Sequence, residues 1–89
     1  MKYRSRADII HAILSAANGG TKPTRIMYAA LISYRQACEY LDFCSSRGLL
    51  VFENGCYCLT ERGRNALDLL EELEKILAAD KILVEVPAR

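Results

Sequence analysis

The chain has 89 residues, of which 52% are hydrophobic and 26% are charged, and its net charge is +1. This length fits one structural domain and excludes a second hydrophobic core, while the composition indicates a chain that folds. Residues 1–60 carry seven Lys and Arg against four acidic residues, a balance of +3, and residues 61–89 carry five against seven, a balance of −2. The mildly basic first part suits a polyanionic partner.

The first ten residues, MKYRSRADII, contain neither a long apolar run nor a small-residue cleavage site, so they do not have the pattern of a secretory signal. No apolar stretch approaches the length of a membrane span. We therefore expect a cytoplasmic protein without a membrane partner. In a reducing cytosol its four cysteines are expected to be free thiols.

Three helices are predicted in the first half of the chain. Residues 6–17 repeat apolar side chains at helical spacing, and the sequence NGG follows them as an end signal. A second helix is expected to begin near Pro23, because proline suits the first helical turn. The third is expected over residues 34–47, where Ser33 and Gln36 have the spacing of a capping box.

A hairpin and a long helix are predicted in the second half. The segments LLVFE and CYCL flank Asn54-Gly55, a strong hairpin signal, because both turn residues need positive φ. Thr60 is expected to cap a helix over residues 61–79, which would be roughly 28 Å long. Residues 80–89 alternate weakly and suggest a short strand or a loose tail. The predicted fold is mainly α with a small β-hairpin, an α+β arrangement.

Two helices joined by a short turn and followed by a hairpin are the layout of a winged helix-turn-helix. We therefore expect one structural domain with three parts. Residues 1–60 would be a winged-helix DNA-binding domain, residues 61–79 a C-terminal coiled-coil dimerisation helix and residues 80–89 a tail.

The expected DNA-binding surface centres on residues 34–47. Ala37, Leu41 and Cys44 have the spacing of a buried helix face, which leaves the opposite face free. Near the start of this helix, arginine pairs well with guanine and glutamine with adenine, and Ser33 with the helix N-terminus can hold a phosphate. The start of the second helix and the Asn-Gly wing tip would contact the DNA backbone. The predicted DNA-binding residues are Lys22, Thr24, Arg25, Ser33, Tyr34, Arg35, Gln36, Glu39, Asn54 and Gly55.

The run TRIMYAALISYRQACEYLDFCSSRGLL, followed by YCLTERGRNAL, resembles the small archaeal winged helix-turn-helix DNA-binding proteins. The resemblance covers residues 5 to about 78, and the pieces TRIMY, ISYRQ, YLDF, GLL and LTERG are specific in combination. It implies a homodimer through an antiparallel coiled coil of the long C-terminal helices. It also implies binding to double-stranded DNA as a transcriptional regulator or chromatin-associated protein.

Two features depart from that family's pattern. Glu39 stands where such proteins often carry a basic residue, and the short wing has no Lys or Arg at its tip. An acid in this position repels phosphate, although it can accept a hydrogen bond from cytosine N4.

The long C-terminal helix carries apolar residues at heptad spacing. The predicted dimerisation residues are Ala66, Leu67, Leu70, Leu73 and Leu77. A small domain covers only the start of such a helix, and each leucine left in water forgoes on the order of 1.5–3 kcal/mol of burial. A second copy would cover them. The alternative is that the helix folds back onto its own domain, with the apolar residues of the tail covering it.

The cysteines raise the question of a metal site. Cys56 and Cys58 share one face of a strand, opposite Tyr57 and Leu59, and the pattern leaves open which face is buried. The other two cysteines are six residues apart on a helix and point roughly 120° apart. Structural zinc needs four ligands around one point, so we expect the cysteines to act as small hydrophobic residues and predict no metal.

No catalytic set is evident. His11 stands alone among apolar positions, and the chain has neither a Ser/His/Asp arrangement nor a phosphate-binding glycine loop. We predict no enzyme and no cofactor. The predicted function is that of a dimeric winged-helix DNA-binding protein, a transcriptional regulator or chromatin-associated protein that reads the major groove with residues 34–47. The alternatives are a winged-helix protein-interaction module that does not bind DNA, and a zinc-stabilised adaptor.

Overall fold

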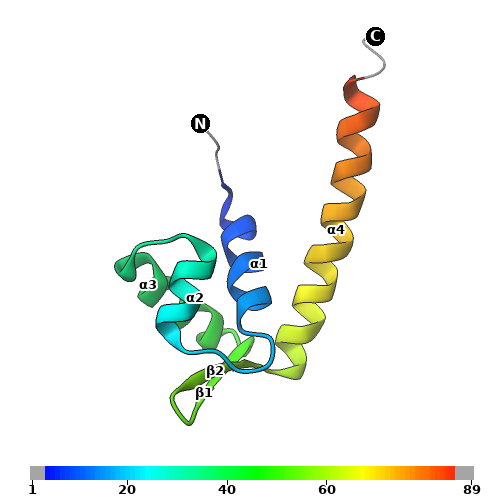
Figure 1. Ribbon diagram of the computed structural model, residues 1–89. Coiled ribbons are helices and arrows are strands. Elements are labelled where there is room, and N and C mark those ends of the chain that lie inside the picture. Colours follow the sequence, from blue (N-terminus) through cyan, green and yellow to red (C-terminus); the bar gives the residue numbers. More distant parts are fainter. Residues whose placement is uncertain (1–3, 86–89) are drawn as a thin grey trace.

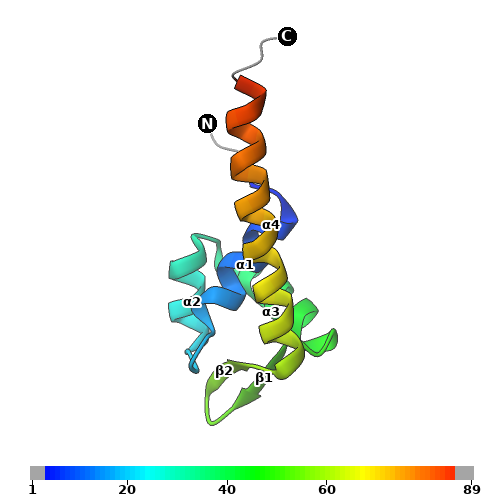
Figure 2. The same cartoon turned by 90° about the vertical axis from the view of Figure 1, so that its right-hand side faces the viewer.

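A computed structural model describes the backbone of residues 4–85 and the side chains of residues 4–78. In chain order its elements are α1 (Arg6–Ala16), α2 (Pro23–Ala30), α3 (Tyr34–Ser46), β1 (Leu50–Glu53), β2 (Cys56–Leu59) and α4 (Glu61–Glu85). Helices α1, α2 and α3 pack together, and the hairpin lies at one end of this bundle (Figure 1). Helix α4 rises beside α1 and extends past its end (Figures 1 and 2). The predicted fold class and element order are confirmed.

The ends of the first two helices are held by side chains. At the start of α1, the Ser5 hydroxyl accepts a hydrogen bond from the Asp8 N–H, and the Asp8 carboxylate accepts one from the Ser5 N–H. These bonds favour the charged carboxylate and lower the pKa of Asp8. Helix α2 ends at Leu31, which has the left-handed conformation with φ 57° and ψ 50°. The Arg4 guanidinium donates to the Ala30 and Leu31 carbonyl oxygens at 2.7 and 2.9 Å, so it stabilises this end.

The hairpin is antiparallel, with Leu50 opposite Leu59 and Phe52 opposite Tyr57. Both residues of its Asn-Gly turn have positive φ, 53° and 78°, which confirms the predicted two-residue turn. Thr21 pairs with the free side of Tyr57 through two backbone hydrogen bonds of 2.8 and 2.9 Å. The loop between α1 and α2 is thereby fixed to the hairpin.

The hydrophobic core lies between the helices and the base of the hairpin. Its buried residues are Ile9, Ile13, Leu14, Ala17, Ile26, Ala30, Leu41, Cys44, Leu50 and Leu67. Ala37, Leu41 and Cys44 form the buried face of α3, as predicted. Burial raises the pKa of the Cys44 thiol to about 11. Tyr57 and Leu59 of β2 pack partly buried against the core, while Cys56 and Cys58 on the other face are half-buried as well.

A close backbone approach fixes the start of α4. The Thr60 hydroxyl accepts a hydrogen bond from the Gly63 N–H at 2.9 Å and donates one to the Gly48 carbonyl oxygen, so Thr60 is the predicted N-cap. A Cβ atom on Gly63 would lie 2.0 Å from the carbonyl oxygen of Leu49. Glycine is therefore required where α4 crosses the chain at Leu49.

Two sequence expectations about α4 need correction. The helix predicted for residues 61–79 continues to Glu85, so the strand or tail expected from residue 80 is wrong for residues 80–85. No Gly or Pro occurs between residues 64 and 86, and a formed helix gains one hydrogen bond for each residue added. Residues 86–89 lie outside the described part. Leu67, expected in a dimer seam, is only 2% exposed and belongs to the core of its own chain.

Candidate nucleic-acid interface

Four residues spaced four apart on α3 and its C-cap form what we call the α3 stripe, in which Phe43 packs partly buried against the core and the other three are exposed: Arg35, Glu39, Phe43 and Arg47. Twelve residues of α-helix separate its ends by roughly 18 Å. The side chains of Arg35 and Glu39 are 89% and 68% exposed, and Arg35 Nε lies 3.8 Å from Glu39 Oε2. An exposed pair one turn apart contributes only about 0.3–0.5 kcal/mol. The Arg35 guanidinium is therefore free to exchange this partner for another anion.

Two arginines flank Phe43. The Arg6 Cζ atom lies 4.6 Å from the centroid of the Phe43 ring, and the Arg47 Cζ atom lies 4.8 Å from it. Arg6 also lies 5.8 Å from the Tyr40 ring centroid. Cation–π contacts restrict the guanidinium groups while leaving their N–H donors available. Neither arginine was among the sequence candidates. The four-residue spacing from Phe43 could have indicated Arg47, but Arg6 reaches α3 only through the packing of α1.

The predicted capping box at the start of α3 is confirmed. The Ser33 hydroxyl accepts a hydrogen bond from the Gln36 N–H, and Gln36 Oε1 accepts one from the Ser33 N–H, both at 3.1 Å. Ser33 and Gln36 were also expected to contact DNA. With these bonds in place, the Ser33 hydroxyl hydrogen and the Gln36 side-chain NH2 are the groups left to act on a ligand.

The other candidate residues lie on two parts of the surface. At the start of α2, Lys22, Thr24 and Arg25 are exposed, and Lys22 makes no side-chain cap hydrogen bond. Thr24 lines one cavity together with Tyr34, so the starts of α2 and α3 share a surface. The exposed wing tip, residues 54–55, lies apart from them at the end of the hairpin (Figure 1).

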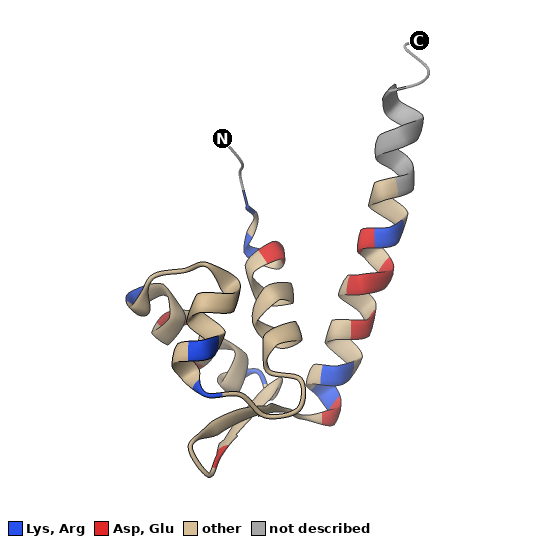
Figure 3. Ribbon diagram, viewed as in Figure 1, with Lys and Arg blue, Asp and Glu red and all other residues tan. Residues whose placement is uncertain are grey.

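The charges divide between the two parts of the molecule. Acidic residues outnumber basic ones along the described part of α4, although basic residues occur at its start and at Lys75, whereas basic residues outnumber acidic ones in the three-helix part (Figure 3). This is the division that the sequence indicated, and it leaves the part of the protein before α4 the more basic one.

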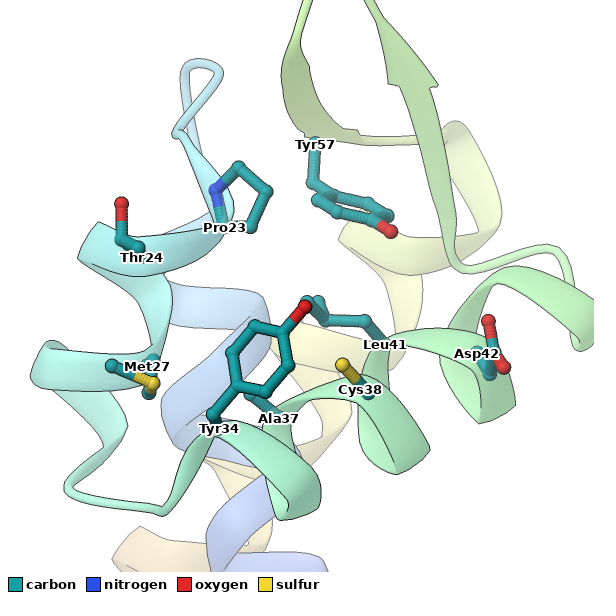
Figure 4. A pocket seen from close by; sticks show the side chains of 9 residues that line it. All are labelled: Pro23, Thr24, Met27, Tyr34, Ala37, Cys38, Leu41, Asp42 and Tyr57. Atoms are coloured by element: carbon teal, nitrogen blue, oxygen red, sulfur yellow. The ribbon is translucent and has the colours of Figure 1, made fainter.

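The cavity between α2, α3 and β2 has a volume of about 310 Å³. Tyr34 from α3 and Tyr57 from β2 reach it from opposite sides, and Cys38 lies beside Tyr34 on α3 (Figure 4). A hydrogen bond with Cys38 raises the pKa of Tyr34. Burial, followed by the nearby Asp42 carboxylate, raises the pKa of Tyr57. Both phenols are therefore neutral around pH 7 and can donate hydrogen bonds.

The cysteines do not gather in space. Cys44 is buried and Cys38 exposed, while Cys56 and Cys58 are half-buried on the hairpin. Within the described residues, no three side chains of His, Cys, Asp or Glu lie close enough together to hold a metal ion. His11 contacts α4, with Nδ1 3.2 Å from Glu74 Oε1 and Nε2 3.8 Å from Glu71 Oε2.

Helix α4 presents apolar side chains that its own domain covers only in part, although Leu73 and Leu77 lie beside α1. Ala66 and Leu70 pack partly buried against the core, in addition to the buried Leu67. Four large apolar side chains remain 47–70% exposed, and we call them the α4 patch: Leu69, Leu73, Ile76 and Leu77. In the part of the chain that the structure describes, no helix is long and apolar enough to cross a membrane.

A helix-turn-helix formed by α2 and α3, supported by α1 and followed by an antiparallel hairpin, defines a winged helix-turn-helix. The chain belongs to the winged helix-turn-helix family, whose pattern it matches over residues 3–78. It is 36% identical over 75 residues to protein MJ0287 of the archaeon Methanocaldococcus jannaschii, a match that covers 83% of this chain and 77% of that protein.

Two solved structures extend the comparison. The first is Sso10a-2, a DNA-binding protein from Sulfolobus solfataricus, with 32% identity and a TM-score of 0.79 over 97% of this chain and 98% of that one. The second is the transcriptional repressor CouR, bound to p-coumaroyl-CoA, with 27% identity and a TM-score of 0.73. That match covers 98% of this chain and 64% of the CouR chain. The predicted resemblance to small archaeal winged-helix proteins is confirmed.

Proposed function

We propose that the protein is a homodimer that binds double-stranded DNA, reads the major groove with α3 and acts as a transcriptional regulator or chromatin-associated protein. The observation that carries this proposal is the α3 stripe. It places an exposed arginine at each end of α3, and an α-helix fits the roughly 12 Å width of the major groove.

Each arginine of this surface has a distinct role in the proposal. Arg35, near the start of α3, is exposed and has a guanidinium fork that suits the O6 and N7 acceptors of guanine. Arg47 and Arg6 sit at the other end, where they would contact the phosphates that border the groove. Base recognition and backbone positioning thus fall to opposite ends of one stripe.

Glu39 lies between these arginines and sets the charge of the surface. In the free protein it neutralises part of the Arg35 charge at 3.8 Å. On DNA its carboxylate would repel phosphates unless it accepts a hydrogen bond from cytosine N4. Glu39 therefore favours selective binding over strong non-specific binding.

The start of α2 and the wing would supply further backbone contacts. Lys22 and Arg25 are exposed beside the N-terminus of α2, where free backbone N–H groups also attract phosphate. Asn54 and Gly55 at the wing tip carry no charge and would contribute only hydrogen bonds. We expect these contacts to position the protein rather than to select a sequence.

The dimer is proposed from the α4 patch. In a single chain its four large apolar side chains remain 47–70% exposed, and completing their burial is worth roughly half or more of the 1.5–3 kcal/mol of a fully exposed side chain. A second copy of α4 removes this exposure by packing the same residues against each other. The two copies of α3 would then contact two half-sites on the DNA, and the paired α4 helices would determine the spacing between these half-sites.

The comparisons support the DNA-binding part of this proposal. Sso10a-2, which is described as a DNA-binding protein, matches nearly the whole of this chain at 32% identity. CouR is described as a transcriptional repressor and shares the fold at 27% identity. A DNA-binding regulator is therefore the function that best unites the fold with the exposed arginines.

Fluorescence anisotropy tests the proposal. Purified protein is titrated into labelled duplexes from random and genomic pools at about 50 and 200 mM salt, because phosphate contacts release counterions and so weaken steeply with salt. Binding that falls at the higher salt, with enrichment of particular sequences, is the expected result. Absence of binding at the lower salt would overturn it.

A second candidate function is a protein-interaction module that does not bind DNA. Tyr28 and Leu31 at the end of α2 are 72% and 79% exposed, and Glu39 works against a polyanionic partner. A peptide that contacts α2 and α3, together with an absence of DNA binding at low salt, would favour this second function.

A further inference from the structure

The cavity between α2, α3 and β2 has no part in the proposed reading of bases by the α3 stripe. Its volume of about 310 Å³ falls at the lower end of the range of small-molecule sites. Its walls come from all three elements of the winged helix, with Met27 on α2, Cys38 on α3 and Tyr57 on β2 (Figure 4). An occupant would therefore contact both helices of the helix-turn-helix and one strand of the hairpin at once.

The lining favours a flat aromatic occupant. The rings of Tyr34 and Tyr57 approach from opposite sides, and Ala37 and Leu41 form an apolar floor between them (Figure 4). The sulfur atom of Met27 adds a polarisable contact at one side. Aromatic side chains on two walls pack well against an aromatic ring in offset or edge-to-face geometry.

Charge selects among aromatic ligands. Asp42 is the only charged residue among the nine that line the cavity. It is exposed at the rim and takes part in none of the ion pairs of the described residues. A carboxylate without a partner beside an apolar cavity attracts a cation and repels a phosphate or a carboxylate. The cavity is thus better suited to a positively charged ligand than to a phosphate, although Thr24 and Tyr34 on its wall are also expected DNA contacts.

We propose that this cavity binds a small aromatic molecule that carries a protonated nitrogen. The ring lies between Tyr34 and Tyr57, and the nitrogen pairs with Asp42. Such a ligand holds α3 and β2 in one relative position, so its binding is coupled to DNA binding. The coupling rests on the proposed function, whereas the ligand site does not. Because coupling is reciprocal, a ligand that changes the affinity for DNA is itself bound more or less tightly when DNA is present.

Three probes of nearly the same shape test the site. Tyramine carries a cation, tyrosol is its neutral analogue, and 4-hydroxyphenylacetate carries an anion. Each is titrated into ¹⁵N-labelled protein while amide shifts are followed by NMR. We expect tyramine to bind most tightly and 4-hydroxyphenylacetate most weakly, with the largest shifts at Tyr34, Cys38 and Tyr57. Shifts confined to other parts of the protein, or equal binding of the three probes, would overturn the proposal.

Two variants distinguish recognition of the ligand's charge from non-specific binding. Asp42→Asn should lower the affinity for tyramine about threefold to fivefold, as expected for an exposed ion pair, and leave tyrosol binding unchanged. Asp68→Asn, at an exposed position on α4, is the matched control and should change neither. An Asp42→Asn variant that binds tyramine as well as the parent would contradict the assigned role of Asp42.

The DNA titration is then repeated with saturating tyramine. A changed affinity for DNA supports the coupling, and an unchanged affinity overturns it while leaving the site in place. If the parent binds tyramine in the cavity but no DNA at low salt, the proposed function fails and the ligand site stands. If the parent binds DNA but none of the probes, the ligand site fails alone.

Discussion

Glu39 lies one helical turn after Arg35 on the exposed face of α3, with its Oε2 atom 3.8 Å from Arg35 Nε. Arg35 is expected to contact a base, whereas the carboxylate of Glu39 repels phosphate and attracts the Arg35 guanidinium. The two side chains therefore have opposite effects on DNA binding. If the proposed interface is correct, the strength of DNA binding depends on the balance between these two charges.

Replacing Glu39 tests that balance. Glu39→Gln removes the like charge that faces phosphate and releases Arg35, so we expect about threefold to tenfold tighter binding at low salt and a smaller gain at high salt. Anisotropy at the two salt concentrations measures the effect. Glu72→Gln, an exposed change on α4, is the control and should leave affinity unchanged. Equal affinity of Glu39→Gln and the parent would place the DNA elsewhere.

Arg35 is expected to carry sequence recognition. Arg35→Ala should weaken binding to the preferred site by about 1–3 kcal/mol and relax sequence selection at one position, because a bidentate contact to guanine is lost. Arg35→Lys keeps the charge without the planar fork, so it should retain non-specific affinity but lose selection. Selection from a random pool with each variant measures both effects. An Arg35→Ala protein that selects the same site as the parent would exclude this role.

Arg6 and Arg47 are expected to act on the backbone instead. The double change Arg6→Ala and Arg47→Ala should reduce the slope of log affinity against log salt by about 0.9 for each lost phosphate contact. Sequence preference should stay the same. Lys75→Ala removes one positive charge from exposed α4 and is the control. An unchanged slope in the double variant, with a normal fold, would remove these arginines from the interface.

The α4 patch is expected to hold the dimer. Leu73 and Ile76 are 47% and 52% exposed, so changing both to Gln should yield monomers at micromolar concentration while the domain stays folded. Sedimentation equilibrium measures the mass, and circular dichroism checks the helix content. By contrast, Leu67→Ala should cost the domain about 2–5 kcal/mol of stability, because Leu67 is a core residue. A parent protein that sediments as a monomer would refute the proposed dimer.

Gly63 tests the junction between the hairpin and α4. Gly63→Ala would gain about 1 kcal/mol of helix propensity on an isolated helix. Here the added Cβ meets the Leu49 carbonyl oxygen at 2.0 Å, so we expect a net loss of about 1–3 kcal/mol in the free energy of unfolding. Urea denaturation measures it, with Asn65→Ala at an exposed position of the same helix as the control. A Gly63→Ala protein as stable as the parent would show that the junction relaxes freely.

Local signals made much of this fold predictable. The capping box of Ser33 and Gln36, the positive φ of the Asn-Gly turn and the buried spacing of Ala37, Leu41 and Cys44 each depend on residues close in sequence. The helix starts, the hairpin and the buried face of α3 could therefore be predicted from the sequence. The family resemblance added the order in which these elements pack.

Features that depend on tertiary packing were missed. Arg6 meets Phe43 only because α1 crosses α3, and the burial of Leu67 depends on how α4 lies against the core. A heptad pattern gives the spacing of apolar residues but not which of them its own domain covers. The sequence likewise could not choose between the faces of β2, because cysteines and the Tyr57–Leu59 pair are both compatible with burial.

The most direct test of the central claim is to locate the DNA on the protein surface. NMR titration of ¹⁵N-labelled protein with its preferred duplex reports which amides change on binding. The proposed interface predicts the largest changes along α3 from Arg35 to Arg47, with smaller ones at the start of α2 and at the wing tip. Changes that cluster on α4 and leave α3 unaffected would contradict it.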